Sequence, residues 1–369
     1  MSYSEDDLYS VFGIENNPKI YCYMIATLQM LFTIKEFREY ILDYEFFLDQ
    51  VQTAYGRSYN ERILKKYCFY ELYNLLKNGD DQRSRSLFAS AKNIDGLKQI
   101  IRKRIADGMF NIGDKKFNID EQNDAAEFLF FFLNILHSEI YRIEKAITLE
   151  EKVSDISNER SYISYVFKIN YDFQINDNGT SYILSKGMRG YNDVKKEIIM
   201  NDYVISIKLN DSRVQSLPKK SLTLQNLLNF SFGIEAITKE YDYYTIVKKF
   251  HDFPTYVMLC IDRFKLNGDK SLMDIDISKT INILGRSYNI ISVVCHNGRS
   301  ARSGHYITFA ERDGYWYLFN DEDFRPTCSD DVLRLISGRD NRLIESREPH
   351  DFNPYLILCK KTENFKHGL

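Results

Sequence analysis

The feature that most constrains the fold of this chain is a change in hydrophobic period near residue 155. Before that point, apolar residues recur at three- and four-residue intervals, as on amphipathic helices, most clearly over residues 124–143. After it, short segments alternate apolar and polar residues, as half-buried strands do, for example over residues 203–209. A run of helices followed by a run of strands indicates an α+β fold.

The same periodicities predict the individual elements. Helices are expected over residues 23–32, 35–47, 61–76, 84–92, 94–109, 124–143 and 222–228. Strands are expected over residues 162–173, 203–209, 256–264, 288–295, 305–310, 315–319 and 355–359. Tight turns are expected at Asp177-Asn178-Gly179 and at Asp313-Gly314.

Composition narrows the class of protein. With 369 residues, 44% of them hydrophobic and 27% charged, the chain can bury a sizeable core. Its 49 Lys and Arg nearly balance 52 Asp and Glu, which argues against a nucleic-acid partner. The acidic first residues form no secretory signal, and no apolar run is long enough to cross a bilayer. The six cysteines form no CxxC pair, so we expect an intracellular protein, cytoplasmic or nuclear, with reduced thiols and no metal or cofactor.

Cys22 is the candidate nucleophile because it stands at the start of a predicted helix. The positive end of the helix dipole and the unpaired N–H groups there favour a thiolate, which is the form that attacks acyl groups. Asn17, five residues upstream, could donate a hydrogen bond to the oxyanion together with the Cys22 backbone N–H. The alternative is a cysteine buried in a core helix, which the local sequence does not exclude.

His305 is the candidate base because it follows a glycine and opens a predicted strand. The next strand ends in Asn320-Asp321, which a hairpin would return beside the imidazole, where either residue could orient the ring. Two alternatives remain open. His305 could be a surface histidine before an ordinary hairpin, and His296, nine residues away, competes for the role of base.

The candidates belong to separated segments that together span nearly the whole chain. The segments are Cys22-Tyr23-Met24 with Leu28-Gln29; Gln122-Asn123-Asp124-Ala125-Ala126-Glu127-Phe128-Leu129; Phe253-Pro254 with residues 259–264; residues 293–298 with Ser303-Gly304-His305-Tyr306 and residues 316–321; and residues 354–358. The first four, in this order, resemble the Cys box, the Gln-Asp box, the Leu-Pro…Lys-Arg-Phe segment and the His box of the ubiquitin-specific proteases, the papain-like deubiquitinases. The last resembles their closing strand.

The resemblance implies a fold and a function. The fold would be a papain-like cysteine protease, α+β, as one catalytic domain over residues 1–369: a helical thumb over about 10–150, finger-like strands over about 151–250, and an antiparallel palm sheet over about 251–369. The function would be thiol-dependent hydrolysis of isopeptide bonds at the C-terminal glycine of ubiquitin. The partners of the protein would be ubiquitin and ubiquitinated proteins. The chain would be a monomer, and an activating partner is possible. The alternatives are a protease for another ubiquitin-like modifier and a catalytically weak ubiquitin-binding scaffold.

The resemblance also implies roles for single residues. Cys22 would be the nucleophile, His305 the base and Asn320 the residue that orients it, with Asp321 as an auxiliary and Asn17 in the oxyanion hole. The ubiquitin tail would lie beside Gln122, Asp124 and Glu127 in a narrow channel lined by Gly304 and Tyr306. For the acidic residues of this set, the alternative is a capping role at the helix N-terminus.

Several positions depart from the family pattern. Lys19-Ile20-Tyr21 replaces the Gly-Asn-Thr that precedes the cysteine, and Ile25 stands where asparagine is usual. A one-residue insertion before Cys22 leaves Asn16 as a second candidate for the oxyanion role. Zinc ligands have no counterpart between about residues 150 and 250, which predicts a finger without zinc.

Overall fold

The computed structural model divides the chain into two compact units, which are described separately. The first comprises residues 1–165 and 294–329, and the second residues 166–293 and 330–369. Within them, the structure describes residues 11–43, 65–77, 91–106, 111–112, 115–147, 161–177, 180–183, 203–209, 214, 216, 222–235, 237–240, 244–264, 270–300, 303–336 and 352–362.

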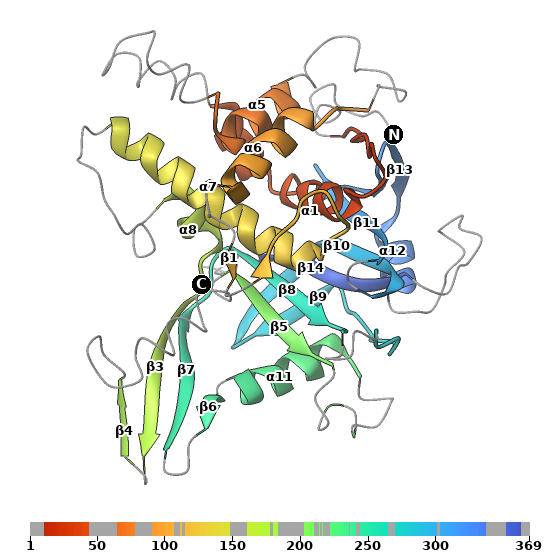
Figure 1. Ribbon diagram of the computed structural model, residues 1–369. Helices are drawn as coiled ribbons and strands as arrows, with labels where there is room; N and C mark the ends of the chain where they lie inside the picture. The colour runs from red at the N-terminus through yellow and green to blue at the C-terminus, as the bar shows by residue number, and fades with distance from the viewer. Residues whose placement is uncertain are drawn as a thin grey trace, which may run out of the picture. The chain divides into compact units, whose positions relative to one another are not determined.

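Helices dominate the first unit. They are α1 (Cys22–Leu31), α2 (Lys35–Leu42), α5 (Cys68–Lys77), α6 (Asp95–Ala106), α7 (Ala125–Ile147) and most of α8 (Tyr162–Phe167), with a small hairpin of β1 (Asn111–Ile112) and β2 (Lys115–Lys116). Every residue of α1 is buried, because it packs against α7 on one side and a strand on the other (Figure 1). Its first residue, Cys22, therefore enters the interior of the unit.

The strands of the first unit form one antiparallel edge of a sheet. Their order is β13 (Asp323–Thr327), β12 (Tyr315–Asn320), β11 (Ser303–Arg312) and then residues 294–300 of β10 (Arg286–Ser300). Asp313 and Gly314 have φ of 50° and 90°, the conformation of a two-residue hairpin turn between β11 and β12. The Thr308 hydroxyl of β11 donates to the Ala26 carbonyl of α1 at 2.9 Å, which ties α1 to this sheet.

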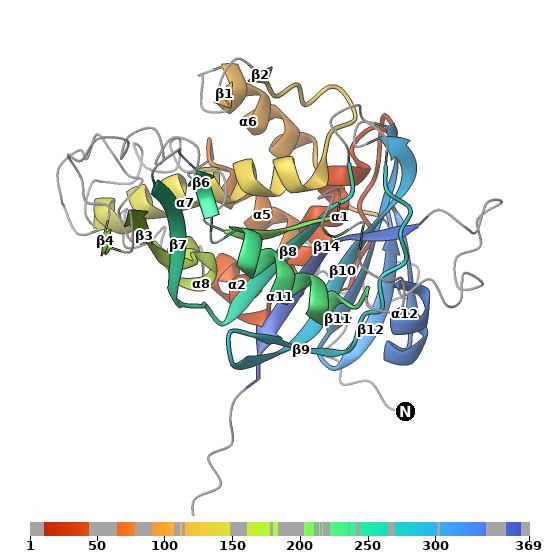
Figure 2. The ribbon, with the colours of Figure 1, turned by 90° about the horizontal axis from the view of Figure 1, so that it is seen from below.

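The second unit is built mainly from strands. In its larger sheet, residues 286–293 of β10 are followed by β14 (Asn353–Lys361), β8 (Tyr256–Asp262) and β5 (Val204–Lys208), and β9 (Thr280–Ile283) pairs with β10. α11 (Leu224–Glu235) packs against β5 and β9 (Figure 2), and α12 (Ser329–Ile336) starts at the boundary with the first unit. A second sheet has the order β4 (Thr180–Ile183), β3 (Asn170–Asp177), β7 (Tyr244–Asp252) and β6 (Ile237–Glu240).

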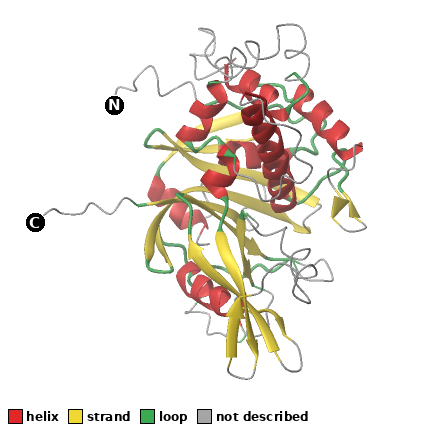
Figure 3. Ribbon diagram, turned by 90° about the vertical axis from the view of Figure 1, so that its left-hand side faces the viewer, coloured by secondary structure: helices red, strands yellow, loops and turns green. Residues whose placement is uncertain are grey.

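The predicted α+β fold is confirmed, as the helices and strands of Figure 3 show. Two details differ. Residues 162–173 were expected to form one strand, but residues 162–167 form α8, where Ser161 and Ser164 cap the turn by mutual side chain–backbone hydrogen bonds. β5 and β8 pair in parallel, because the chain crosses over through α11 and two strands before returning.

Some predictions are only partly covered by the described residues. The helix expected over residues 84–92 lies outside them except for its last two residues, and Lys92 there forms a bridge with Ile14. In the described part of the chain, the helix expected over residues 61–76 begins at Cys68. The helix expected over residues 35–47 ends at Leu42. No described helix is both long and apolar enough to span a membrane. The division into thumb, finger and palm within one domain stays a prediction.

Candidate active site

The Cys22 thiol lies inside the first unit, at the first turn of α1. It is 2% exposed, and it accepts hydrogen bonds from the backbone N–H of Tyr306 and of Tyr23. Tyr306 follows His305 directly on β11. The sulfur therefore lies beside the backbone that carries the predicted base.

His305 is held from the other side by the end of β12. Its Nε2 lies 2.6 Å from Asn320 Oδ1 and 3.9 Å from Asp321 Oδ2. Because an amide oxygen only accepts hydrogen bonds, this contact places an N–H on Nε2, so Nδ1 is the nitrogen that can accept a proton when the imidazole is neutral. The hairpin of β11 and β12 thus brings together the residues predicted as base and orienting partner. The His305 side chain is 35% exposed.

The two asparagines before Cys22 have different surroundings. The Asn16 side chain is buried: its Oδ1 accepts from the Tyr21 N–H at 2.9 Å, and its Nδ2 donates to Asp321 Oδ2 at 2.9 Å. Asn17 is exposed, and its backbone carbonyl accepts from Lys98 Nζ at 3.1 Å. The sequence signal for Asn16 was the one-residue insertion before Cys22. Three residues before Asn16, Gly13 packs so closely on the Glu322 carbonyl that no side chain fits there.

The segment before α7 also meets the start of β11. Gln122 Oε1 accepts from the Gly304 N–H at 3.3 Å, and its Nε2 donates to the Gly304 carbonyl at 3.5 Å. Gly304 has a φ of 134°, and a Cβ there would lie 1.9 Å from the Asn297 carbonyl oxygen, so only glycine fits. Of the predicted tail-binding residues, the structure therefore brings Gln122 and Gly304 into contact.

The other predicted residues take up different positions. Asp124 Oδ1 accepts from the N–H groups of Ala126 at 2.7 Å and Glu127 at 3.0 Å, so it caps α7. The Tyr306 ring is buried against His296, with 4.4 Å between ring centroids. His296, the competing base candidate, is completely buried there.

Burial governs the electrostatics of the thiol. It raises the pKa of Cys22 to about 11, because the hydrogen bond from the Tyr306 N–H only partly offsets burial and the Asp321 carboxylate adds to the rise. Burial likewise raises the pKa of Asp321, against the opposing effects of Asn16 and His305. The N–H groups at the helix N-terminus favour the thiolate, but burial opposes ionisation more strongly, so a base is needed to ionise this sulfur.

This pKa predicts how fast the Cys22 thiol reacts with a small neutral electrophile. Only the thiolate reacts, so the rate of Cys22 alkylation by iodoacetamide is expected to rise about tenfold per pH unit between roughly pH 8 and 10. Pulsed labelling followed by mass spectrometry measures this rate, with the exposed Cys328 as an internal reference. A rate that is already level below pH 8 would contradict the raised pKa.

No metal site accompanies these residues. In the described part of the chain, no three His, Cys, Asp or Glu side chains are grouped as metal ligands would be. Much of residues 150–250 lies outside that part, so the finger without zinc stays a prediction.

Comparisons with known proteins place this geometry in context. The sequence model of a family described as "Ubiquitin carboxyl-terminal hydrolase" matches residues 12–355. The Schizosaccharomyces pombe protein named "Probable ubiquitin carboxyl-terminal hydrolase 4" is 22% identical over 390 aligned positions, which cover 92% of this chain and 57% of that protein. "Ubiquitin carboxyl-terminal hydrolase 35" of Homo sapiens is 28% identical over 138 positions, covering 27% of this chain and 14% of its own. The chain thus spans little more than half the length of the fission yeast relative.

Solved structures show the same fold. A chain of the Ubp8–Sgf11–Sgf73–Sus1 SAGA DUB module has a TM-score of 0.61 at 18% identity, and the match covers 98% of this chain and 70% of that chain. A variant of this module bound to monoubiquitin gives a TM-score of 0.61 at 17% identity, covering 98% and 72%. At these identities, the likeness establishes the fold.

Proposed function

The chain belongs to the ubiquitin carboxyl-terminal hydrolase family, and we propose that it is a deubiquitinase whose nucleophile is Cys22. The observation that carries the proposal is the meeting of α1 and β11. The Cys22 thiol accepts from the Tyr306 N–H, one residue beyond His305, while the His305 Nε2 contacts Asn320. A thiol, an imidazole and an orienting amide in this relation are the parts of a cysteine protease site.

The proposed reaction uses these groups in sequence. His305 Nδ1 takes the thiol proton, and the sulfur attacks the carbonyl carbon of the C-terminal glycine of ubiquitin. The imidazolium then gives its proton to the departing lysine amine, which leaves a thioester on Cys22. His305 next takes a proton from water, whose oxygen attacks the thioester. The C–S bond then breaks, the sulfur takes the imidazolium proton, and ubiquitin leaves as a carboxylic acid that loses its proton to solvent.

The oxyanion of each tetrahedral intermediate needs donors beyond the Cys22 backbone N–H. Asn17 remains the candidate from the sequence. The contacts favour Asn16, because its amide is held between the Tyr21 backbone and the Asp321 carboxylate. Asp321 thereby acts as an auxiliary that fixes the Asn16 amide and faces the imidazole.

The ubiquitin tail is the proposed substrate segment. Its arginines would meet carboxylates near the start of α7, where Asp124 and Glu127 lie, and its two glycines would pass Gly304 and Tyr306. Gln122, which contacts the Gly304 backbone, stands at the same place. An intracellular location, cytoplasmic or nuclear, belongs to this proposal.

Partner proteins are part of the proposal as well. One structural neighbour is a SAGA DUB module bound to monoubiquitin, in which Ubp8 is assembled with Sgf11, Sus1 and Sgf73. By analogy, we expect this chain to bind ubiquitin, with room for an activating partner. The alternatives remain a protease for another ubiquitin-like modifier and a scaffold that binds ubiquitin without cleaving it.

One experiment separates these three functions. The wild-type chain is incubated with fluorophore conjugates of ubiquitin and of other ubiquitin-like modifiers, and binding of ubiquitin is measured in parallel. The proposal expects hydrolysis of the ubiquitin conjugate with the highest kcat/KM. Preference for another modifier supports the first alternative, and ubiquitin binding without hydrolysis supports the second.

A further inference from the structure

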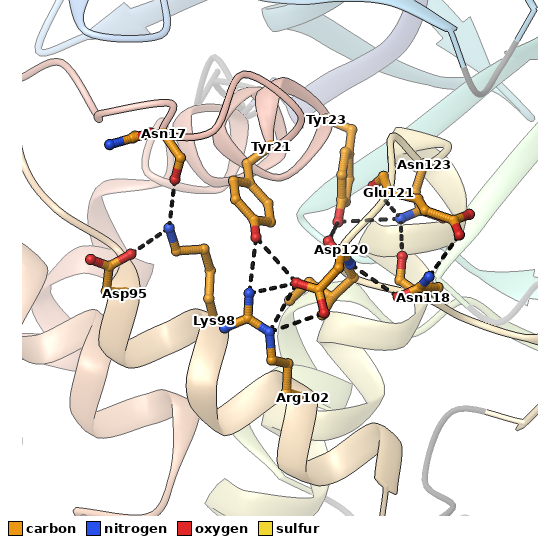
Figure 4. A network of polar contacts seen from close by, with 11 residues as sticks. Asn17, Tyr21, Tyr23, Asp95, Lys98, Arg102, Asn118, Asp120, Glu121 and Asn123 are labelled. Atoms are coloured by element: carbon orange, nitrogen blue, oxygen red, sulfur yellow. Dashed lines mark hydrogen bonds and ion pairs between the residues drawn. The ribbon is translucent and has the colours of Figure 1, made fainter.

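Lys98 of α6 contacts both ends of the segment that leads into the nucleophile, residues 17–21 (Figure 4). Its Nζ donates to the Asn17 carbonyl at 3.1 Å and lies 4.5 Å from the centre of the Tyr21 ring. The Lys98 residue is only 5% exposed, and its charge is balanced by an ion pair with Asp95 one turn earlier. Lysine is rarely buried to this degree unless its ammonium group is paired, and Lys98 contacts the Asn17 carbonyl, Asp95 and the Tyr21 ring. These contacts hold its side chain in one position.

Arg102, one turn further along α6, holds the same segment by its tyrosine. Its Nη2 donates to the Tyr21 hydroxyl at 3.0 Å, and its Nε donates to Asp120 Oδ1 at 3.0 Å. The Tyr21 hydroxyl in turn donates to Asp120 Oδ1 at 3.4 Å. The Arg102 hydrogen bond lowers the pKa of Asp120, so this carboxylate is ionised and keeps the network charged.

The helix geometry explains why one element supplies the whole network. Asp95, Lys98 and Arg102 are separated by three and four residues, so they share one face of α6. The Tyr21 ring, which is almost fully buried, lies between that face and the segment before α7. The helix thereby contacts Tyr21 twice, through Lys98 at the ring and through Arg102 at the hydroxyl.

Residue 21 matters because its backbone joins the Asn16 side chain to the start of α1, where the Cys22 N–H lies. The Tyr21 N–H donates to Asn16 Oδ1 at 2.9 Å, and its carbonyl accepts from the Ile25 N–H at 3.0 Å as the first bond of α1. Any shift of Tyr21 would displace the Asn16 amide and the Cys22 N–H together. Through its contacts with the Tyr21 side chain, α6 fixes the position of this backbone.

We propose that Lys98 and Arg102 are positioning residues that hold residues 17–21 in the shape that completes the oxyanion site before substrate binds. This inference rests on the proposed hydrolase function. The segment carries Lys19-Ile20-Tyr21 in place of the family's Gly-Asn-Thr. The proposed positioning role therefore depends on residues of this chain that differ from the family pattern. Anchoring the Tyr21 ring and the Asn17 carbonyl supplies the order that the oxyanion donors need.

The decisive variant is Lys98→Met, which keeps the length of the side chain and removes its charge. We expect kcat for a ubiquitin–fluorophore to fall about tenfold to thirtyfold with KM nearly unchanged, because the displaced donors serve the transition state. The rate of Cys22 alkylation by iodoacetamide should stay within about twofold of wild type, since that displacement of iodide forms no oxyanion. Lys98→Arg should restore much of kcat.

Two further variants guard against a general loss of structure. Lys103→Met changes an exposed lysine on the same helix and should leave kcat and KM at their wild-type values. Tyr21→Phe keeps the buried ring and removes only the hydroxyl bonded to Arg102 and Asp120, and a loss of about threefold in kcat is expected. Hydrogen exchange of the amides of residue 17 and residues 19–22 should be faster in Lys98→Met than in wild type or Lys103→Met.

The outcomes distinguish the two proposals. If the wild type hydrolyses ubiquitin–fluorophore while Lys98→Met keeps full kcat, or loses alkylation in step with kcat, the positioning role is overturned and the hydrolase function stands. If the wild type itself hydrolyses nothing, the proposed function fails and the catalytic role of Lys98 fails with it. Hydrogen exchange still reports in that case whether Lys98 holds the segment, and unchanged exchange in Lys98→Met contradicts that as well.

Discussion

Replacing Cys22 by Ala is expected to remove hydrolysis of a ubiquitin–fluorophore, with a loss of at least about 10⁴-fold in kcat/KM. The reason is that the covalent thioester cannot form without the sulfur, and no other cysteine shares this site. Cys68, Cys260, Cys295 and Cys359 are buried elsewhere, and Cys328 is exposed at the end of β13. The measurement is the initial rate of fluorophore release at saturating and subsaturating substrate.

The matched control is Cys328→Ala, which removes an exposed thiol and should keep wild-type kcat/KM. Cys22→Ala deletes one sulfur from a buried site, so circular dichroism should show a folded chain. The variant should also retain ubiquitin binding, because the tail contacts do not involve the sulfur. Wild-type rates in Cys22→Ala would refute its role as nucleophile.

Replacing His305 by Ala is expected to lower kcat/KM by about 10³- to 10⁴-fold at neutral pH. The raised thiol pKa, about 11, makes the base essential, because only about one thiol in three thousand would ionise unaided at pH 7.5. The residual rate of His305→Ala should therefore climb with pH, about tenfold per unit up to roughly pH 10, as the thiolate forms without help. A pH profile of kcat/KM for this variant and the wild type measures the effect.

Asn320→Ala provides the graded comparison, because it keeps the imidazole and removes the oxygen 2.6 Å from Nε2. Its loss should be smaller than that of His305→Ala, about tenfold to a hundredfold, and its pH profile should keep the wild-type shape. If His305→Ala retained most of the activity while Asn320→Ala abolished it, the assignment of base and orienting residue would be wrong.

Sequence periodicity was sufficient for the long elements and the tight turn. The predicted helix over residues 124–143 corresponds to α7, whose apolar face is broad enough to define a helix without tertiary information. Asp313-Gly314 marks the turn between β11 and β12 because few other residue pairs tolerate positive φ at both positions. That turn determines the register that brings Asn320 back to His305, so the contact between these two residues was predictable.

Short and non-local features were not predictable in the same way. α8 has only six residues, too few for its period to be told from that of a strand, and two serines at its start decide for helix. The choice between Asn16 and Asn17 depends on how a loop with one extra residue folds against Asp321, which lies 305 residues further along the chain than Asn16. Lys98 carried no sequence signal at all, since its partners at residues 17 and 21 are distant in sequence.

The thiol pKa shows the same limit in energetic terms. The effect of a helix N-terminus is local and can be read from the position of Cys22, and it favours the thiolate. Desolvation depends on everything packed around the sulfur, including β11 and the Asp321 carboxylate. Desolvation outweighs the local effect here, so in the proposed mechanism the thiol stays protonated until the imidazole accepts its proton.

The central claim is that Cys22 itself attacks the C-terminal carbonyl of ubiquitin, and covalent trapping tests it most directly. The wild-type chain is incubated with ubiquitin that carries a thiol-reactive electrophile in place of its last glycine, and the adduct is located by peptide mass spectrometry. We expect one ubiquitin per chain, attached to Cys22, with no adduct in Cys22→Ala. Attachment to a different cysteine, or a wild-type chain that binds the probe without reacting, would contradict the claim.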